Sequence, residues 1–272
     1  MQSADQKLFL ETLWNYYAAN GRDLPWRHAE PDGRFDAYKI MVSEFMLQQT
    51  QVSRVIPKYQ QFLEAFPTVI DLAQAALVDV LRAWNGLGYN RRAKFIHEAA
   101  KAIAKLHGGS VPLDIEQLKL LPGIGHNTAA AILAYADNQA VVFVETNIRT
   151  VYIHHFFPEA NDVTDAEILG RLNETLDREH PREFYWALMD YGSHLKATQG
   201  NSARRSKSYS KQSVFAGSKR QVRGQVIREL LEKPQPITRL QSAIPDERLS
   251  SVIDDLCSEG IVILEKQQYR LA

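Results

Sequence analysis

Two acidic side chains lie in sequence surroundings that could give them a chemical role. Glu44 lies in the segment SEFMLQQTQ, and Glu145 lies in the segment VETNIR. A carboxylic acid in a desolvated pocket can protonate a leaving group and then act as a base toward water. A second carboxylate that stays ionised can stabilise a developing positive charge. Without the neighbouring motifs, acids at helix ends or on the surface would be the favoured interpretation of both residues.

A proline and two glycines between these acids predict a tight hairpin. The segment LLPGIG contains Pro122, Gly123 and Gly125, and the helix-forming run HNTAA follows it. The second glycine would leave backbone N–H groups unobstructed at a helix N-terminus, where they can bind a phosphate oxygen. An ordinary turn between two helices could use the same residues, so the hairpin alone indicates DNA binding only weakly.

Charge is unevenly distributed along the chain. The 272 residues include 32 basic and 32 acidic side chains, and 45% hydrophobic residues with 24% charged residues are ordinary for a globular protein. No acidic residue occurs between Asp190 and Glu229. The basic residues of that tract are Lys196, Arg204, Arg205, Lys207, Lys211, Lys219, Arg220, Arg223 and Arg228. Such a tract suits contact with a phosphate backbone, although a solvated linker could have the same composition.

Composition also argues against several classes of protein. The single cysteine, Cys257, excludes an intramolecular disulfide and a cysteine-rich metal cluster, and we expect it to be a small core residue. No apolar run approaches the length of a membrane span. The first residues lack the pattern of a secretory signal. We therefore expect a cytoplasmic protein, associated with the nucleoid if the cell is bacterial.

Helical periodicity covers the first two thirds of the chain. Apolar residues at three- and four-residue spacing predict an all-α domain, and only the short apolar run 141–144 is compatible with a strand. The predicted helices are 5–19, 37–50, 52–65, 68–74, 77–84, 90–107, 114–120, 126–136, 145–156, 165–179 and 181–196.

The remainder of the chain predicts a linker and a small α/β module. Residues 199–218 have the polar composition of a loop, which separates a first domain (1–198) from a second (219–272). Three helices are predicted in the module: one that begins at 219, a short one that is capped by Thr238 and runs to 244, and one that covers 246–258. The runs 261–264 and 268–271 then predict a two-stranded wing. This order resembles a winged helix. Its third helix is acidic, which favours packing or partner binding over reading of a DNA groove and makes a transcription regulator a weak alternative.

The order and spacing of several motifs carry a family resemblance. The hairpin, the downstream Glu145 and the upstream SEFMLQQTQ segment resemble the endonuclease III/MutY branch of the helix-hairpin-helix DNA glycosylases. The segments LPWR (24–27), WNGLGY (84–89) and ALMDYG (187–192) extend the resemblance over roughly residues 8–195. It implies two helical subdomains with the active site between them, and MLQQTQ with GLGY points to the MutY-type adenine glycosylases.

The resemblance assigns a role to each acid. Excision of a flipped base breaks an N-glycosidic bond through a sugar with oxocarbenium character. Glu44 matches the acid that protonates the leaving base and then activates water. Glu145 matches the carboxylate that stabilises the sugar cation, although the family usually has Asp there, and one methylene could shift the carboxylate by about 1 Å. Asn147 matches an asparagine that organises the sugar and the water.

The residue that follows the hairpin indicates direct hydrolysis. Relatives that also cleave the strand carry a lysine two residues after the last hairpin glycine, where its amine attacks the sugar. Here that residue is Asn127, and an amide cannot form a Schiff base. We therefore expect a glycosylase without strand-cleaving activity.

The resemblance also predicts contacts with double-stranded DNA. Gln48 matches a side chain that fills the space left by the flipped base, and Tyr89 matches an aromatic wedge beside the opposite base. The full set of expected DNA-contacting residues is Gln48, Gln49, Tyr89, Gly123, Gly125, His126, Asn127, Thr128, Arg204, Arg205 and Lys207. The backbone carbonyls of Lys119, Leu121 and Ile124 would hold a structural Na⁺ or K⁺ that bridges to phosphate.

The sequence departs from the family in two ways. The four cysteines that ligate an iron–sulfur cluster in most relatives are missing, so no cluster is expected, and the basic tract could contact DNA in its place. The C-terminal module is also shorter than the domain that senses 8-oxoguanine. We therefore expect a monomer that excises mispaired adenine opposite guanine or 8-oxoguanine. Excision of mispaired thymine, uracil or a damaged base, and a catalytically silent DNA-binding protein, are the alternatives.

Overall fold

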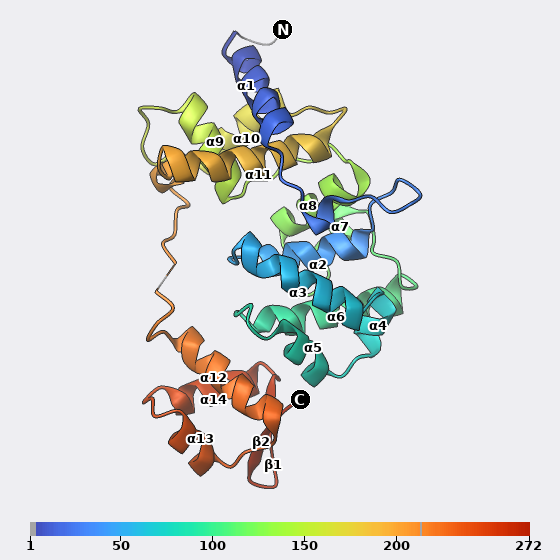
Figure 1. Cartoon of the computed structure of the whole chain (residues 1–272), viewed down its shortest axis with the longest axis vertical. Helices are drawn as coiled ribbons and strands as arrows, with labels where there is room; N and C mark the ends of the chain where they lie inside the picture. The colour runs from blue at the N-terminus through green and yellow to red at the C-terminus, as the bar shows by residue number, and fades with distance from the viewer. Residues whose placement is uncertain (1–3, 213) are drawn as a thin grey trace. The chain divides into compact units, whose positions relative to one another are not determined.

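The computed structural model describes residues 4–212 and 214–272, which form mainly helices with a small sheet near the C-terminus (Figure 1). Met1 to Ser3 of the expected first domain, and Ser213 of the expected linker, lie outside the described residues. The expected fold class, helical with a small C-terminal α/β module, is confirmed. The chain divides into two compact units, one of residues 1–40, 113–119 and 124–211 and one of residues 41–112, 120–123 and 212–272.

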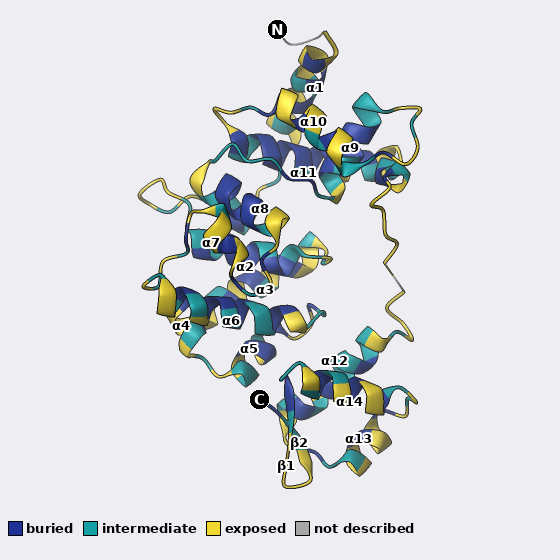
Figure 2. Ribbon diagram, turned by 180° about the vertical axis from the view of Figure 1, so that it is seen from behind, coloured by how far each residue is buried: buried dark blue, intermediate teal, exposed yellow. Residues whose placement is uncertain are grey.

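Helix α11 is the centre of the first unit. It packs against α9, α1 and α8, and most of its residues are buried (Figure 2). The helices of this unit are α1 (Ala4–Asn20), η1 (Pro25–Arg27), α7 (Ile115–Lys119), α8 (His126–Asp137), α9 (Thr146–Phe156), α10 (Asp165–Thr175), α11 (Pro181–Thr198) and η2 (Ser202–Arg205).

Helix α6 occupies the corresponding position in the helical part of the second unit, where it packs against α4 and α5. This part contains most of α2 (Ala37–Leu47), then α3 (Val52–Ala65), α4 (Val69–Gln74), α5 (Leu77–Trp84) and α6 (Arg91–Leu106). The C-terminal module contains α12 (Lys219–Glu232), α13 (Ile237–Ala243), α14 (Leu249–Ser258), β1 (Val262–Glu265) and β2 (Gln268–Leu271).

The two strands form the expected antiparallel wing. Val262 pairs with Leu271 and Glu265 pairs with Gln268, so only Lys266 and Gln267 connect the strands. Both connecting residues have positive φ, 49° and 63°, as a two-residue turn that follows the strand twist requires. Helix α12 packs against α14 and β2, which completes a winged-helix order of elements.

Several local predictions need correction. The run 141–144 forms no strand, because side chains occupy two of its carbonyls: Tyr185 donates to the Val141 oxygen at 2.7 Å and Asn127 to the Val144 oxygen at 2.9 Å. Thr238 does not cap α13, because the helix begins one residue earlier, after Pro236. Helix α2 ends at Leu47 and not at 50, α10 ends at Thr175 and not at 179, and α14 begins at Leu249 and not at 246.

A buried carboxylate joins the N-terminal segment of the first unit to α11. Asp190 accepts hydrogen bonds from both nitrogens of the Arg27 fork, at 2.8 Å each, and from the backbone N–H and Nε of Arg22, at 2.8 and 2.7 Å. Burial raises the pKa of the Asp190 carboxyl, but the two arginines outweigh it and hold the pKa below its ordinary value. The LPWR and ALMDYG motifs therefore meet in one ion-pair cluster.

A buried guanidinium has the equivalent role in the second unit. Arg92 Nη1 donates to the backbone oxygens of Phe45, Met46 and Gln48, at 2.7, 3.0 and 2.6 Å. Its Nη2 donates to Thr50 Oγ1 at 3.0 Å and to two carbonyls of the loop before α6. One side chain thus terminates α2 and fixes the α5–α6 loop.

The Asp190 cluster makes the first unit sensitive to acid. Because the folded pKa is depressed, its stabilisation is present above the unfolded pKa of about 4 and is lost as pH falls through the folded pKa. We expect Asp190→Asn to lower the free energy of unfolding at pH 7 by about 3–5 kcal/mol, because it removes one charge from a buried cluster. Urea titrations between pH 2 and 7 should show a weaker pH dependence in this variant. Asp23→Asn, at an exposed carboxylate, is the control, and equal losses in both variants would contradict the prediction.

Arg92→Lys tests the guanidinium network. Lysine keeps the charge but cannot replace a planar fork that reaches six acceptors, so we expect the free energy of unfolding to fall by roughly 2–4 kcal/mol. Arg91→Lys, at the exposed neighbouring position, should change it by less than about 0.5 kcal/mol. Chemical denaturation of both variants provides the measurement. A similar effect at both positions would show that the network is not required.

Candidate functional site

Helix α2 positions Glu44 in the second unit. The neighbouring Ser43, Phe45 and Met46 are fully buried, and this burial fixes the rotation of the helix about its axis. Glu44 itself is half-buried. The residue therefore projects from a rigid element and not from a loop.

The first turn of α9 presents Glu145 in the first unit. Glu145 is the N-cap residue, but its side chain makes no capping hydrogen bond. The residue as a whole is half-exposed, whereas its carboxyl is removed from water, and this desolvation raises the pKa of Glu145. Arg149, one turn further on, opposes the shift, although its guanidinium is already bound by Asp165 through two hydrogen bonds of 2.7 Å.

Asn147 presents an unused hydrogen-bond acceptor beside Glu145. Its Nδ2 contacts the Met189 sulfur at 3.7 Å, and its buried Oδ1 has no hydrogen-bond partner in the described part of the chain. An unsatisfied buried acceptor is costly, and such groups mark sites where a ligand or water is to be bound.

Gly192 allows α11 to approach the backbone of Asn147. A Cβ at position 192 would lie 2.5 Å from the Asn147 oxygen and 2.9 Å from its Cβ. Only glycine fits this approach. The sequence motif ALMDYG therefore sets the position of a residue 45 positions away, a role that we did not predict from the sequence.

The two hairpin glycines have different roles. Gly123 has φ +77°, and a Cβ there would lie 2.6 Å from the Phe95 Cβ, so the fold itself requires glycine. Gly125 is the N-cap of α8 with φ −90°, and a Cβ there would meet nothing within 4 Å. Its lack of a side chain leaves the N-terminus of α8 open, beside the exposed His126.

Asn127 links this helix to the segment that carries Glu145. Its Nδ2 donates to the Val144 carbonyl at 2.9 Å, directly before Glu145. The hydrogen bond gives the asparagine a positioning role that the sequence did not indicate. Thr128 is half-buried at the same helix start.

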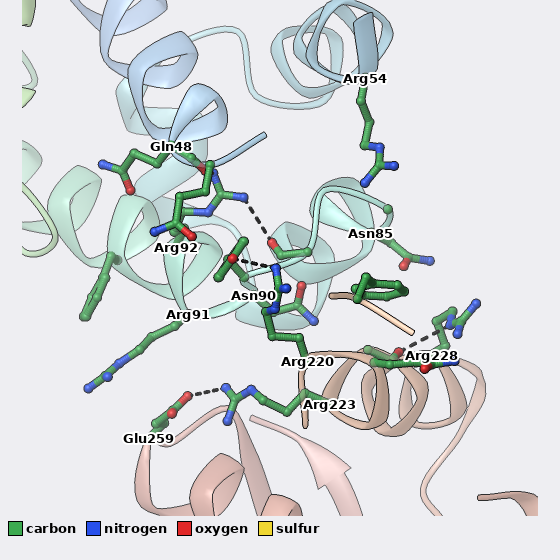
Figure 3. A pocket seen from close by; sticks show the side chains of 18 of the residues that line it. Gln48, Arg54, Asn85, Asn90, Arg91, Arg92, Arg220, Arg223, Arg228 and Glu259 are labelled. Carbon is green, nitrogen blue, oxygen red and sulfur yellow. Dashed lines mark hydrogen bonds and ion pairs between the residues drawn. The ribbon is translucent and has the colours of Figure 1, made fainter. Parts of the chain in front are cut away.

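Gln48, Gln49 and Tyr89 come together in the second unit. Gln49 and Tyr89 both have positive φ, 55° and 46°, which is uncommon for residues other than glycine. The Tyr89 hydroxyl accepts hydrogen bonds from Arg220 Nη1, at 2.5 Å, and from Gln212 Nε2, which also donates to Gln49 Oε1 at 3.4 Å. The predicted base-flipping residues thus line one cavity, in which Figure 3 labels Gln48.

The basic residues after α11 divide into two kinds. Arg205 donates to the carbonyls of Phe157, Pro158 and Ala160, at 2.7, 2.5 and 3.1 Å, so it satisfies the backbone after α9. Arg204 and Lys207 are exposed. The structure therefore gives Arg205 a structural role that we did not predict and leaves the other two available to a ligand.

The described residues offer neither a metal-binding cluster nor a membrane-spanning helix. They contain no group of three or more His, Cys, Asp or Glu side chains that could hold a metal ion. None of their helices combines the length and the low polarity needed to span a bilayer.

Comparison with known proteins agrees with these motifs. Residues 42–177 match the family model of the HhH-GPD superfamily base excision DNA repair proteins. The chain is 36% identical to the adenine DNA glycosylase of Mycolicibacterium smegmatis, over 92% of this chain and 91% of that protein. It is also 36% identical to the human adenine DNA glycosylase, over 70% of this chain and 36% of that protein.

Solved structures agree as well. A thermostable thymine-DNA glycosylase matches with a TM-score of 0.63 and 25% identity, over 73% of this chain and 90% of that one. An endonuclease III–DNA complex matches with a TM-score of 0.60 at 17% identity, which shows a common fold. By its motifs, its fold and its near full-length similarity to a curated relative, the chain belongs to the HhH-GPD superfamily of base excision DNA repair proteins.

Proposed function

We propose that the protein is a DNA glycosylase that hydrolyses the N-glycosidic bond of adenine mispaired with guanine or 8-oxoguanine. The observation that carries this proposal is the 36% identity, over nearly the whole of both chains, to a protein named adenine DNA glycosylase. The substrate is double-stranded DNA, and the enzyme acts as a monomer. Its location is the cytoplasm, at the nucleoid if the cell is bacterial.

Glu44 and Glu145 divide the chemistry in this proposal. Glu44 protonates the leaving base and then takes a proton from the attacking water, as a general acid and base. Glu145 stabilises the positive charge that develops on the sugar. The desolvation that raises its pKa also strengthens its attraction to a nearby cation, since the attraction grows as the local dielectric falls.

Asn147 positions the reactants. Its unpaired Oδ1 is an acceptor for a sugar hydroxyl or for the attacking water. Asn127 supplies no amine and is engaged with Val144, which supports direct hydrolysis without strand cleavage.

The remaining site residues contact DNA in this proposal. The open N-terminus of α8, with Gly125, His126 and Thr128, binds a phosphate, supported by a monovalent cation on the carbonyls of Lys119, Leu121 and Ile124. Gln48, Gln49 and Tyr89 enter the duplex. Arg204 and Lys207 contact the DNA backbone without an iron–sulfur cluster. The functional segments in this proposal are the glycosylase domain 1–198, the basic linker 199–218 and the C-terminal module 219–272.

Single-turnover excision with labelled duplexes tests the proposal. Duplexes with adenine opposite 8-oxoguanine or guanine should give a nick only after alkali treatment, because hydrolysis leaves an abasic site and an intact strand. We expect Glu44→Gln to lower the rate by at least about 100-fold, since it removes the acid and base. Glu64→Gln, in α3 and outside the site, is the control.

Other outcomes of the same assay identify the alternatives. If only thymine or uracil opposite guanine is released, the protein is a mismatch thymine or uracil glycosylase, like the structurally similar thymine-DNA glycosylase. Nicking without alkali would contradict direct hydrolysis. Mismatch binding without release of any base would favour the catalytically silent protein.

Gly192→Ala tests whether the position of Asn147 matters for catalysis. The added Cβ must displace the Asn147 backbone, so we expect the excision rate at saturating DNA to fall by about 100-fold. Overpacking should cost about 1–3 kcal/mol of stability. Gly170→Ala, in α10 where a Cβ meets nothing within 4 Å, is the matched control and should keep the wild-type rate. Equal rates in the two variants would contradict the positioning role.

A further inference from the structure

A cavity of about 540 Å³ lies within the second unit, against the C-terminal module. One wall comes from the turn after α2, the α5–α6 loop and the start of α6, and the other comes from α12 (Figure 3). Its volume falls within the range of ligand pockets, roughly 300–1,000 Å³.

The lining of this cavity is strongly basic. Among the described residues, six arginines line it, and its one acidic lining residue, Glu259, is already paired with Arg223 at 2.6 Å. The arginines are Arg54, Arg91, Arg92, Arg220, Arg223 and Arg228. Arg54, Arg91 and Arg228 are exposed and form no ion pair with a carboxylate in the described part of the chain. Such an excess of positive charge in a cavity attracts an anion.

Aromatic rings lie among these cations. Two guanidinium groups approach the Tyr89 ring, with the Arg220 carbon 4.9 Å and the Arg92 carbon 5.4 Å from its centroid. Phe215 also lines the cavity and is 57% exposed, which is a large fraction for a phenylalanine. Basic side chains together with exposed aromatic rings are the combination that binds a base and its phosphate.

The acidic third helix of the module does not neutralise the positive charge of the cavity. Asp255 of α14 is paired with Lys219 at 2.6 Å, and Asp246 is paired with Arg248 at 2.6 Å. The cavity is lined by α12 and not by α14. The basic face of the module is therefore on its first helix.

We propose that this cavity binds one nucleotide of the DNA substrate, with the base on Tyr89 and Phe215 and the phosphates on Arg54 and Arg228. The inference rests on the proposed function, because that function supplies DNA as the ligand. It assigns the C-terminal module a direct contact with nucleic acid through α12, in place of groove reading by its third helix.

Fluorescence anisotropy with a labelled mismatch duplex, at a series of salt concentrations, tests the proposal on the full-length protein. Arg54→Gln and Arg228→Gln should each raise the Kd about 5- to 10-fold and lower the salt dependence of binding by about one ion. Phe215→Ala should raise the Kd at least about 5-fold with little change in salt dependence, because it removes a stacking surface.

Arg239→Gln is the matched control. It removes one exposed arginine from the same module, on α13 and outside the cavity, and should leave the Kd unchanged. If the cavity variants bind the duplex as Arg239→Gln does, the proposal is wrong. A variant could also lose affinity because it unfolds. Thermal denaturation of the same samples detects this, and the variants at the exposed Arg54 and Arg228 should melt like the wild type.

A free nucleotide is the other source of the same chemistry. Calorimetric titration with deoxyguanosine monophosphate distinguishes a free nucleotide from DNA. The DNA proposal would be overturned if the protein bound this nucleotide saturably and the cavity variants lost that binding but kept their affinity for the duplex. Failure of the proposed function is separable, because the Kd comparison does not depend on base release. Cavity effects on Kd without any excision by the wild type would contradict only the glycosylase proposal.

Discussion

The buried guanidinium of Arg92 is the interaction on which the second unit depends. It bonds to backbone oxygens at the end of α2 and in the α5–α6 loop, two segments that share no helix or sheet hydrogen bonds. Gln49 and Tyr89 are held in left-handed conformations beside it. Such conformations persist only where the surroundings over-determine them, and Arg92 supplies that constraint to the residues proposed to enter DNA.

The same guanidinium also contributes charge. Burial lowers the pKa of Arg92 to about 10, so the group remains protonated near neutral pH. The acceptors of its Nη1 are carbonyls at the C-terminal end of α2, where the helix dipole favours a cation, and no carboxylate pairs with Arg92 in the described part of the chain. The anchor of the turn is therefore also part of the positive lining of the cavity. Architecture and electrostatics depend on one side chain here.

Sequence patterns predicted the elements well where the chain determines its own structure. Helices α3 and α5 begin and end where periodicity and turn residues place them, and the wing follows from two short apolar runs. The ends of α2 and α13 did not follow, because Arg92 and Pro236 set them. For the site, motifs could nominate Glu44, Glu145 and Asn147. They could not reveal the Arg92 network or the approach of Gly192, because single residues far apart in sequence give no periodic signal.

The glutamate at position 145 has a consequence that follows from helix capping. An N-cap aspartate is short enough to accept hydrogen bonds from the first N–H groups of its helix, and such bonds lower a carboxyl pKa. Glu145 makes no capping bond, so desolvation dominates and its pKa is raised. The nearest opposing charge, Arg149, is held by Asp165. The extra methylene thus removes the carboxyl from the support of its own helix. In the proposed mechanism, the sugar cation becomes the partner that most favours the ionised form, so that this interaction is stronger in the transition state than in the bound substrate.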